Sequence, residues 1–255
     1  MYEEAVSAAV PGAVLWRATA GGGSMVLPDG CMDLLWVDGR LLVAGPDTGP
    51  HPAGEVPGGA FAGIRLAPGT APALIGVPAH ALRDLRVELA DLWPARAVRR
   101  ASALVEGYGV EGYGVEGYGD VRAGLEALAR ARATDAGAPD LLTAEVVARL
   151  RAGEAVAAIA RAVGLGERQL HRRSLDAFGY GPRTLGRILR LRRALALARA
   201  GLPYAEVACV AGYADQAHLA REVRALAGTT LRAYASGADG AKSETPQPSG
   251  SRTTA

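Results

Sequence analysis

The sequence contains few lysines, few aromatic residues and few cysteines. Lys242 is the only lysine among 28 basic residues, and aromatic residues make up 5% of the chain. The two cysteines, Cys31 and Cys209, show neither the spacing of a metal site nor a disulfide framework. His51 and His80 have no second histidine or acidic residue at the spacing of metal ligands. We therefore expect no metal site and no other cofactor.

Long apolar runs are also missing. No stretch approaches the roughly 20 apolar residues of a membrane-spanning helix. Residues 1–12 are acidic, unlike a signal peptide, which has a basic start and an apolar centre. These absences predict a cytoplasmic protein without a membrane partner.

Neither cysteine has the surroundings of a catalytic thiol. Cys31 has no Arg, Lys or His beside it in the sequence to lower the pKa of its thiol, so we expect it to lie in a core or to be partly buried. Cys209 lies in an apolar stretch and is expected to be buried. We expect no catalytic residue and no enzymatic activity.

Charge is distributed unevenly, although the net value is only +2. Residues 1–139 carry 11 arginines and 16 acidic residues, a net charge of −5, whereas residues 140–236 carry 15 arginines and 8 acidic residues, a net charge of +7. A basic region beside an acidic remainder is typical of nucleic-acid binding. The alternative is that the arginines only solvate helices, and the charge excess alone does not decide between the two.

Residues 1–92 are predicted to form a β-rich domain. Short apolar runs alternate with turn residues, and Asp38-Gly39 between two runs is a strong signal for a two-residue hairpin. A loop rich in Gly and Pro is expected over residues 45–59. The expected strands cover residues 13–19, 24–27, 31–37, 41–44 and 61–66, and short helices are expected at 71–75 and 78–84.

Two charged residues, Asp33 and Arg65, interrupt apolar strands of this domain. Burying either charge alone is costly, so each requires a partner or a polar ligand. The functional interpretation is that the planar guanidinium of Arg65 binds an anionic effector. The simpler interpretation, which we favour, is that the two residues pair or face water.

Residues 93–139 are expected to be a helical connector, with helices over 94–105 and 121–133. Between these helices, the unit Glu-Gly-Tyr-Gly followed by Val or Asp occurs three times from Glu106 to Asp120. So short a unit cannot form a solenoid repeat, and its glycine content predicts a flexible loop. Tyrosines that stack on a partner are the alternative. Residues 237–255 are small and polar and predict a disordered tail.

Two copies of one helical unit organise residues 140–236. In each copy, an Ala- and Val-rich helix ends near a glycine, Gly164 or Gly212, where a left-handed residue closes a helix at little cost. A short turn leads into a second helix that begins with hydrogen-bonding residues. This order is that of a helix-turn-helix, whose second helix enters the DNA major groove. A long helix over residues 182–200 joins the copies.

The side chains of each second helix fall on two sides. Leu170 and Ser174 in the first copy, and Leu219 and Val223 in the second, form a stripe that packs on the domain itself. Arginine, histidine and glutamine beside this stripe can contact bases and phosphates. Ordinary amphipathic surface helices are the alternative, which the tandem repetition makes less favourable. The candidate DNA-binding residues are Arg168, Gln169, His171 and Arg172, then Gln216, His218 and Arg221.

This region resembles the DNA-binding domain of the AraC/XylS family of transcription regulators. The resemblance runs through IARAVGLGERQLHRR, FGYGPRTLGRILRLRRALALA and VACVAGYADQAHLAREVRALAGTTLRAY. It is most specific in the second copy, at Gly212, Tyr213, Asp215, His218, Leu219, Arg221, Gly228 and Tyr234. The chain departs from the pattern of the family at Gly166, Ser174, Val223 and Leu231, where that pattern has Ser, an aromatic residue, an aromatic residue and Pro.

The resemblance implies that both recognition helices lie in successive major grooves on one face of DNA. The connecting helix would be roughly 28 Å long at 1.5 Å per residue, which suits a spacer for a DNA turn of about 34 Å. Ser174 removes apolar area worth on the order of 2 kcal/mol relative to an aromatic residue, unless Leu175 or Phe178 fills the space. The implied base or phosphate contacts are Arg168, His171 and Arg172, then Gln216, Ala217, His218 and Arg221.

The N-terminal stretches PDGCMDLLW, VAGP, GIRLAPG and residues 77–93 resemble the small β-type domain that precedes the DNA-binding half in one branch of AraC-like regulators. The implied role is sensing or partner contact, through a small-molecule effector, a homodimer or RNA polymerase.

We therefore predict an α+β protein: a β-rich domain over residues 1–92, a connector over 93–139, a tandem helix-turn-helix domain over 140–236 and a tail over 237–255. The predicted function is sequence-specific binding of double-stranded DNA in transcription regulation. One alternative is an enzymatic N-terminal domain with a thiol or metal site, as in AraC-like DNA-repair alkyltransferases, which would need clustered cysteines. The other is an effector-free, dimeric DNA-binding scaffold.

Overall fold

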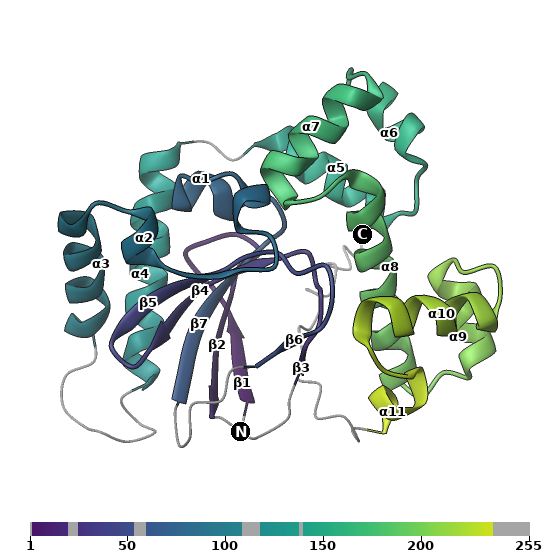
Figure 1. Cartoon of the computed structure of the whole chain (residues 1–255), viewed down its shortest axis with the longest axis horizontal. Coiled ribbons are helices and arrows are strands. Elements are labelled where there is room, and N and C mark those ends of the chain that lie inside the picture. The colour runs from purple at the N-terminus through teal and green to yellow at the C-terminus, as the bar shows by residue number, and fades with distance from the viewer. Residues whose placement is uncertain (1, 20–24, 54–59, 109–117, 138–139, 237–255) are drawn as a thin grey trace, which may run out of the picture.

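The computed structural model of the chain describes residues 2–19, 25–53, 60–108, 118–137 and 140–236. Strands dominate the N-terminal part and helices alone form the C-terminal part (Figure 1), which confirms the predicted α+β class. The middle of the five-residue repeat and the tail from residue 237 lie outside the described residues, so the expectations for them stay predictions. Within the described ranges, no helix is long and apolar enough to cross a membrane.

The main sheet of the N-terminal part has six antiparallel strands in the order β1-β2-β7-β4-β5-β8. On β4, Met32, Leu34 and Trp36 point into the core because alternate residues share one face. Asp38 and Gly39 both have positive φ between β4 and β5, as the predicted hairpin requires. The strands are β1 Tyr2–Val6, β2 Val14–Thr19, β4 Met32–Val37, β5 Arg40–Ala44, β7 Ala60–Leu66 and β8 Arg86–Glu88.

A separate sheet of two strands is formed by β3 (Met25–Val26) and β6 (His51–Pro52). The predicted strands that correspond to β2, β4, β5 and β7 are confirmed, and β3 lies within its expected range. The sequence pattern does not predict β1, β6 or β8. Strands β1 and β8 are the charged edges of the large sheet and carry no apolar alternation, and β6 is two residues within the expected loop over 45–59.

Two helices complete the core of the N-terminal part. Helix α4 (Tyr118–Ala136) packs on the sheet and α3 (Ala95–Gly107) packs on α4. Gly124 permits this close approach, because a Cβ at that position would lie 2.8 Å from the Cα of Val105. Both helices occupy the range predicted as a connector, and their apolar residues join the core of the sheet. The shorter helices are α1 Ala71–Ile75, η1 Ala79–Leu82 and α2 Leu89–Leu92.

The C-terminal part consists of two helical units joined by one helix, α8 (Figure 1). Leu185 and Ile188 of α8 lie in the core of the first unit, and Leu191 and Leu195 lie in the core of the second. The first unit comprises α5 Leu141–Arg151, α6 Val156–Ala162 and α7 Glu167–Phe178. The joining helix α8 is Pro182–Arg199, and the second unit comprises α9 Tyr204–Ala211, α10 Gln216–Ala227 and α11 Leu231–Ala235.

The two cysteines differ from each other in burial. Cys31 is half-buried, as expected. The expectation that Cys209 is buried is wrong, because its side chain is exposed on α9. Val207, Ala208 and Ala211 of that helix point into the core, and a helix of 3.6 residues per turn places the residue after Ala208 on another side.

Ser174 occupies the core of the first unit with a polar side chain. It is 1% exposed, and its hydroxyl has no hydrogen-bond partner among the described residues. Phe178, one turn further along α7, is 3% exposed and fills space in the same core. The hydroxyl is therefore desolvated without compensation, which costs about 1–3 kcal/mol.

We expect Ser174→Ala to raise the free energy of unfolding by about 1–2 kcal/mol, because it removes this uncompensated hydroxyl. Urea unfolding followed by circular dichroism measures the change. Ser102→Ala on α3 is the control, since Ser102 is only half-buried and reports the gain in helix propensity of about 0.5 kcal/mol alone. Equal gains in the two variants would contradict the desolvation argument.

Candidate DNA-binding surface

The turn of the first unit is closed by backbone hydrogen bonds between α6 and the residues before α7. The amide of Leu165 donates to the carbonyl of Ala160 at 2.8 Å, and the amide of Gly164 donates to the carbonyl of Arg161 at 3.1 Å. Gly164 has a φ of 68°. This left-handed conformation favours glycine and ends α6, as predicted.

The four candidate residues of the first unit, Arg168, Gln169, His171 and Arg172, are all exposed on α7. The side-chain oxygen Oε1 of Gln169 accepts a hydrogen bond from the amide of Gly166 at 3.0 Å. Gln169 therefore caps its own helix, in the geometry of a capping box without the reciprocal serine. This cap engages the carbonyl oxygen that a bidentate contact to adenine would also use.

The ring of His171 lies against the start of α8. A Cβ at Gly181 would be 2.6 Å from both Cε1 and Nδ1 of this ring, so the glycine makes room for it. Arg168 and Arg172 are one turn apart on the same helix, and neither forms an ion pair with any described residue. The two arginines thus contribute free positive charge to the first recognition helix, beside the exposed Arg173.

The second unit has the same turn, with a stronger cap. Helix α9 ends at Gly212, which has a φ of 80°, and the amide of Tyr213 donates to the carbonyl of Ala208 at 2.8 Å. The Asp215 carboxylate accepts from the amide of His218 at 2.6 Å. An aspartate at this position satisfies an otherwise free amide of the first turn of α10.

The four candidate residues of the second unit lie at the start of α10 and differ in exposure. Gln216, Ala217 and Arg221 are exposed, whereas His218 is half-buried. The His218 ring meets the ring of Tyr213 edge-on at 5.2 Å, and its Nδ1 accepts from the amide of Ala214 at 3.4 Å. The ring is therefore held by its own turn, and Nε2 is the nitrogen left to donate outward.

A charged clamp joins the second recognition helix to α8. Nε and Nη2 of Arg187 each donate to the Glu222 carboxylate at 2.9 Å. Arg190 lies 3.8 Å from the same carboxylate, and its guanidinium stacks over the Tyr213 ring at 4.5 Å. The hydrogen bonds from Arg187 lower the pKa of Glu222. Sequence reasoning missed this clamp, although Glu222 is the single acidic residue in the sequence of α10.

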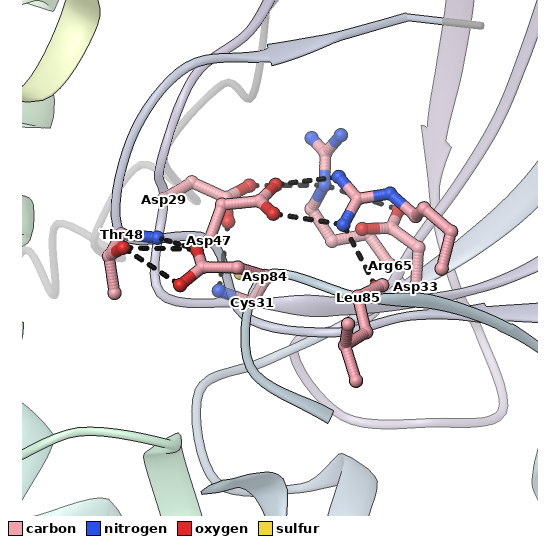
Figure 2. Close-up of polar contacts among 9 residues, drawn as sticks. Asp29, Cys31, Asp33, Asp47, Thr48, Arg65, Asp84 and Leu85 are labelled. Atoms are coloured by element: carbon pink, nitrogen blue, oxygen red, sulfur yellow. Dashed lines mark hydrogen bonds and ion pairs between the residues drawn. The ribbon is translucent and has the colours of Figure 1, made fainter. Parts of the chain in front are cut away.

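Arg65, the candidate for binding an effector, lies in a buried charge cluster of the N-terminal part (Figure 2). Its Nε lies 3.2 Å from Oδ2 of Asp29 and 3.5 Å from Oδ1 of Asp33. Trp16 Nε1 donates to the same Asp33 oxygen at 2.6 Å. Burial raises the pKa of the Asp33 carboxyl, and the charge of Arg65 opposes the rise. The two carboxylates account for the burial of Arg65, and its role toward an anionic effector stays a prediction.

A second ion pair of the same cluster ties the loop after β5 to β8. Nη1 and Nη2 of Arg86 donate to the two oxygens of Asp47 at 2.9 and 2.7 Å. Beside them, the Thr48 amide donates to Asp84 at 2.6 Å (Figure 2).

Burial raises the pKa of the Cys31 thiol well above its ordinary value, and the Asp29 carboxylate adds to the rise. This thiol is therefore kept in its unreactive, protonated form.

Comparisons with known protein families found two matches in the chain. Residues 159–237 match a family described as a helix-turn-helix domain, and residues 14–88 match a domain of unknown function, DUF6597. The comparison with curated proteins found no match.

Similar solved structures include several of ToxT from Vibrio cholerae. An apo variant from strain SCE256 has 10% identity and a TM-score of 0.49, and the match covers 91% of this chain and 98% of ToxT. ToxT from O395 has 10% identity and a TM-score of 0.45 over 88% and 96% of the two chains. A structure of wild-type ToxT with a bound unsaturated fatty acid has 10% identity and a TM-score of 0.46 over 88% and 94%.

The helix-turn-helix match, the two units joined by α8 and the preceding β domain define a DNA-binding transcription regulator. Residues 159–237 thus carry the helix-turn-helix domain that the resemblance to the AraC/XylS family predicts.

We expect Glu222→Gln to lower the free energy of unfolding by about 1 kcal/mol at pH 7, since Arg187 is partly exposed and solvent screens the pair. The pKa of Glu222 is lowered from 4.5 in the folded protein. The carboxylate therefore stabilises the fold above that ordinary value, and this contribution is lost as the pH falls through the folded pKa. Urea unfolding of both proteins from pH 7 to pH 4 tests this. Glu145→Gln, at an exposed pair within α5, is the control. A Glu222→Gln deficit that persists unchanged at the acid end would contradict the assignment.

Proposed function

We propose that the protein recognises a specific DNA sequence by inserting α7 and α10 into successive major grooves. Arg168, Arg172 and Arg221 would contact phosphates and guanine edges, and Gln216 would contact an adenine. One observation carries the proposal. Helices α7 and α10 both expose arginine and glutamine side chains, and α8 contributes to the cores of both units to which they belong.

The length of α8 supports two successive grooves. Its 18 residues span about 27 Å at 1.5 Å per residue. The helix is thus somewhat shorter than a DNA turn of about 34 Å, and the recognition helices extend outward from it. Half-sites one turn apart on one face of the duplex fit this arrangement.

His218 and Gln169 are proposed to contribute less to base reading than the arginines. Each already makes a hydrogen bond within its own turn. Their remaining donors, Nε2 of His218 and the amide nitrogen of Gln169, suit phosphate or water-mediated contacts. His171 lies against Gly181 and would reach the DNA backbone beside the first half-site.

The N-terminal part is proposed to modulate DNA binding without catalysis of its own. A small-molecule effector, a second copy of the chain and RNA polymerase are the proposed partners, in the cytoplasm, where the DNA is. The acidic net charge of residues 1–139 supports a role other than DNA contact.

Selection of genomic fragments by the purified protein tests the proposal. We expect Arg172→Ala and Arg221→Ala each to cost about 1–3 kcal/mol of binding and to relax selectivity at their own half of the site. Arg151→Ala is the matched control, since Arg151 is exposed at the end of α5 outside both recognition helices. Unchanged affinity and unchanged fragments in both variants would refute the assignment of contacts.

A broad panel of metabolites in a thermal-shift assay tests modulation by an effector. We expect at least one compound to raise the melting temperature, by mass action on the folded state, and to change the affinity for the selected DNA. Static light scattering of the same samples tests self-association. No thermal response across the panel, together with a monomer in solution, would remove the support for modulation.

A further inference from the structure

The two-stranded sheet of β3 and β6 lies between the six-stranded sheet and the C-terminal helices (Figure 1). Met25 pairs with Pro52, and Val26 pairs with His51. The chain leaves β3 through residues 27–30, which we call the bridging segment, and then enters β4. This short stretch of the N-terminal part touches both helix-turn-helix units.

The first residue of the bridging segment completes the core of the second unit. Leu27 is 1% exposed, and every other fully buried residue of that core lies between Leu191 and Tyr234. Met25 packs against the same core from β3. A side chain of the N-terminal part is therefore built into the packing beneath the second recognition helix.

The last residue of the bridging segment abuts the first unit. Gly30 has a φ of 85°, and a Cβ there would lie 2.9 Å from Cδ1 of Leu185. Leu185 is fully buried in the first core. The bridging segment thus spans the two cores within four residues.

The middle of the bridging segment is fixed to the N-terminal part. The Asp29 carboxylate accepts from the amide of Cys31 at 2.8 Å and lies 3.2 Å from Nε of Arg65. Because both partners are largely buried, this anchor is screened little by solvent.

The N-terminal part also contacts both recognition helices at their C-terminal ends. Gly228 closes α10, and a Cβ there would be 3.0 Å from Cγ of Pro50, beside β6. Gly179 closes α7 against Pro46, and its carbonyl accepts from Nη1 of Arg83 at 3.4 Å. Nδ1 of His80 lies 3.2 Å from the Asp176 carboxylate on α7.

We propose that Leu27 is a positioning residue for DNA recognition: through the bridging segment, the N-terminal part sets the placement of α10 relative to α7. This inference rests on the proposed function. Two linked modules gain affinity only when their geometry lets both engage at once. A fixed placement makes binding depend on the spacing between half-sites, and a loosened placement relaxes that dependence.

Leu27→Ala in the full chain tests this inference. The readout is fluorescence anisotropy with four duplexes: the selected site, the same site with two base pairs inserted between its half-sites, and each of the two half-sites alone. For the native protein we expect the insertion to weaken binding by about tenfold, comparable to a mismatched base pair. For Leu27→Ala we expect the same insertion to weaken binding by less than about threefold. We also expect weaker binding of the intact site and unchanged binding of the isolated half-sites.

Three further variants separate positioning from general destabilisation. Leu41→Ala makes the same change at a residue 3% exposed in the core of the six-stranded sheet, and should keep the native spacing penalty. Leu27→Met should restore that penalty. Pro50 is half-buried and faces Gly228, so Pro50→Ala should lose part of the dependence of binding on half-site spacing. This variant covers the case in which Leu27→Ala does not fold.

Each outcome decides a separate point. The inference is overturned if the two inserted base pairs weaken binding by both Leu27→Ala and Pro50→Ala as much as they weaken binding by the native protein. It is also overturned if Leu41→Ala loses this dependence on spacing to the same extent as Leu27→Ala. If Leu27→Ala does not fold, the Pro50→Ala result alone decides. A native protein that selects no DNA fragment at all overturns the proposed function instead.

Discussion

A single helix has to complete two hydrophobic cores. Leu185 and Ile188 of α8 are buried in the first unit, and Leu191 and Leu195 are buried in the second. Each unit alone has three short helices, and short helices owe most of their stability to tertiary packing. Neither recognition helix is therefore stable apart from α8. The same burial fixes where each unit sits along α8, so the constraint that stabilises the units also sets the distance between the surfaces that meet DNA.

Hydrogen bonding within the turns decides which polar side chains are available to DNA. Gln169 caps α7, and His218 accepts from the amide of Ala214, so both are partly committed before DNA arrives. Glu222 would repel phosphate if it were free, but Arg187 neutralises it with two hydrogen bonds. The net charge left at the surface of the recognition helices is then positive, because their exposed arginines outnumber their free carboxylates. The interaction of such arginines with phosphate is long-ranged and sensitive to salt.

Local patterns in the sequence predict much of this architecture. Alternation and the Asp38-Gly39 pair predict β4 and β5, and the glycines at 164 and 212 predict both turns. The cap by Gln169 could have been read from its position three residues after Gly166. What local patterns cannot predict is contact between distant segments: the charged edge strands β1 and β8, the Arg187–Glu222 clamp and the burial of Leu27 in a core more than 160 residues away in sequence. The side of α9 on which Cys209 lies was likewise decided by packing.

The dependence of both units on residues 27–30 gives the N-terminal part a short physical route to DNA recognition. Asp29 is held by Arg65, and its neighbour Gly30 abuts the first core while Leu27 enters the second. A buried ion pair is sensitive to any group that competes for either partner, because the charge left over is costly in a medium of low dielectric. A change at Arg65 would therefore act on the bridging segment directly, through Asp29. Packed cores shift between discrete arrangements more readily than they deform. The result would therefore be an altered placement of α10 relative to α7, and with it a change in the spacing between half-sites that the protein binds best.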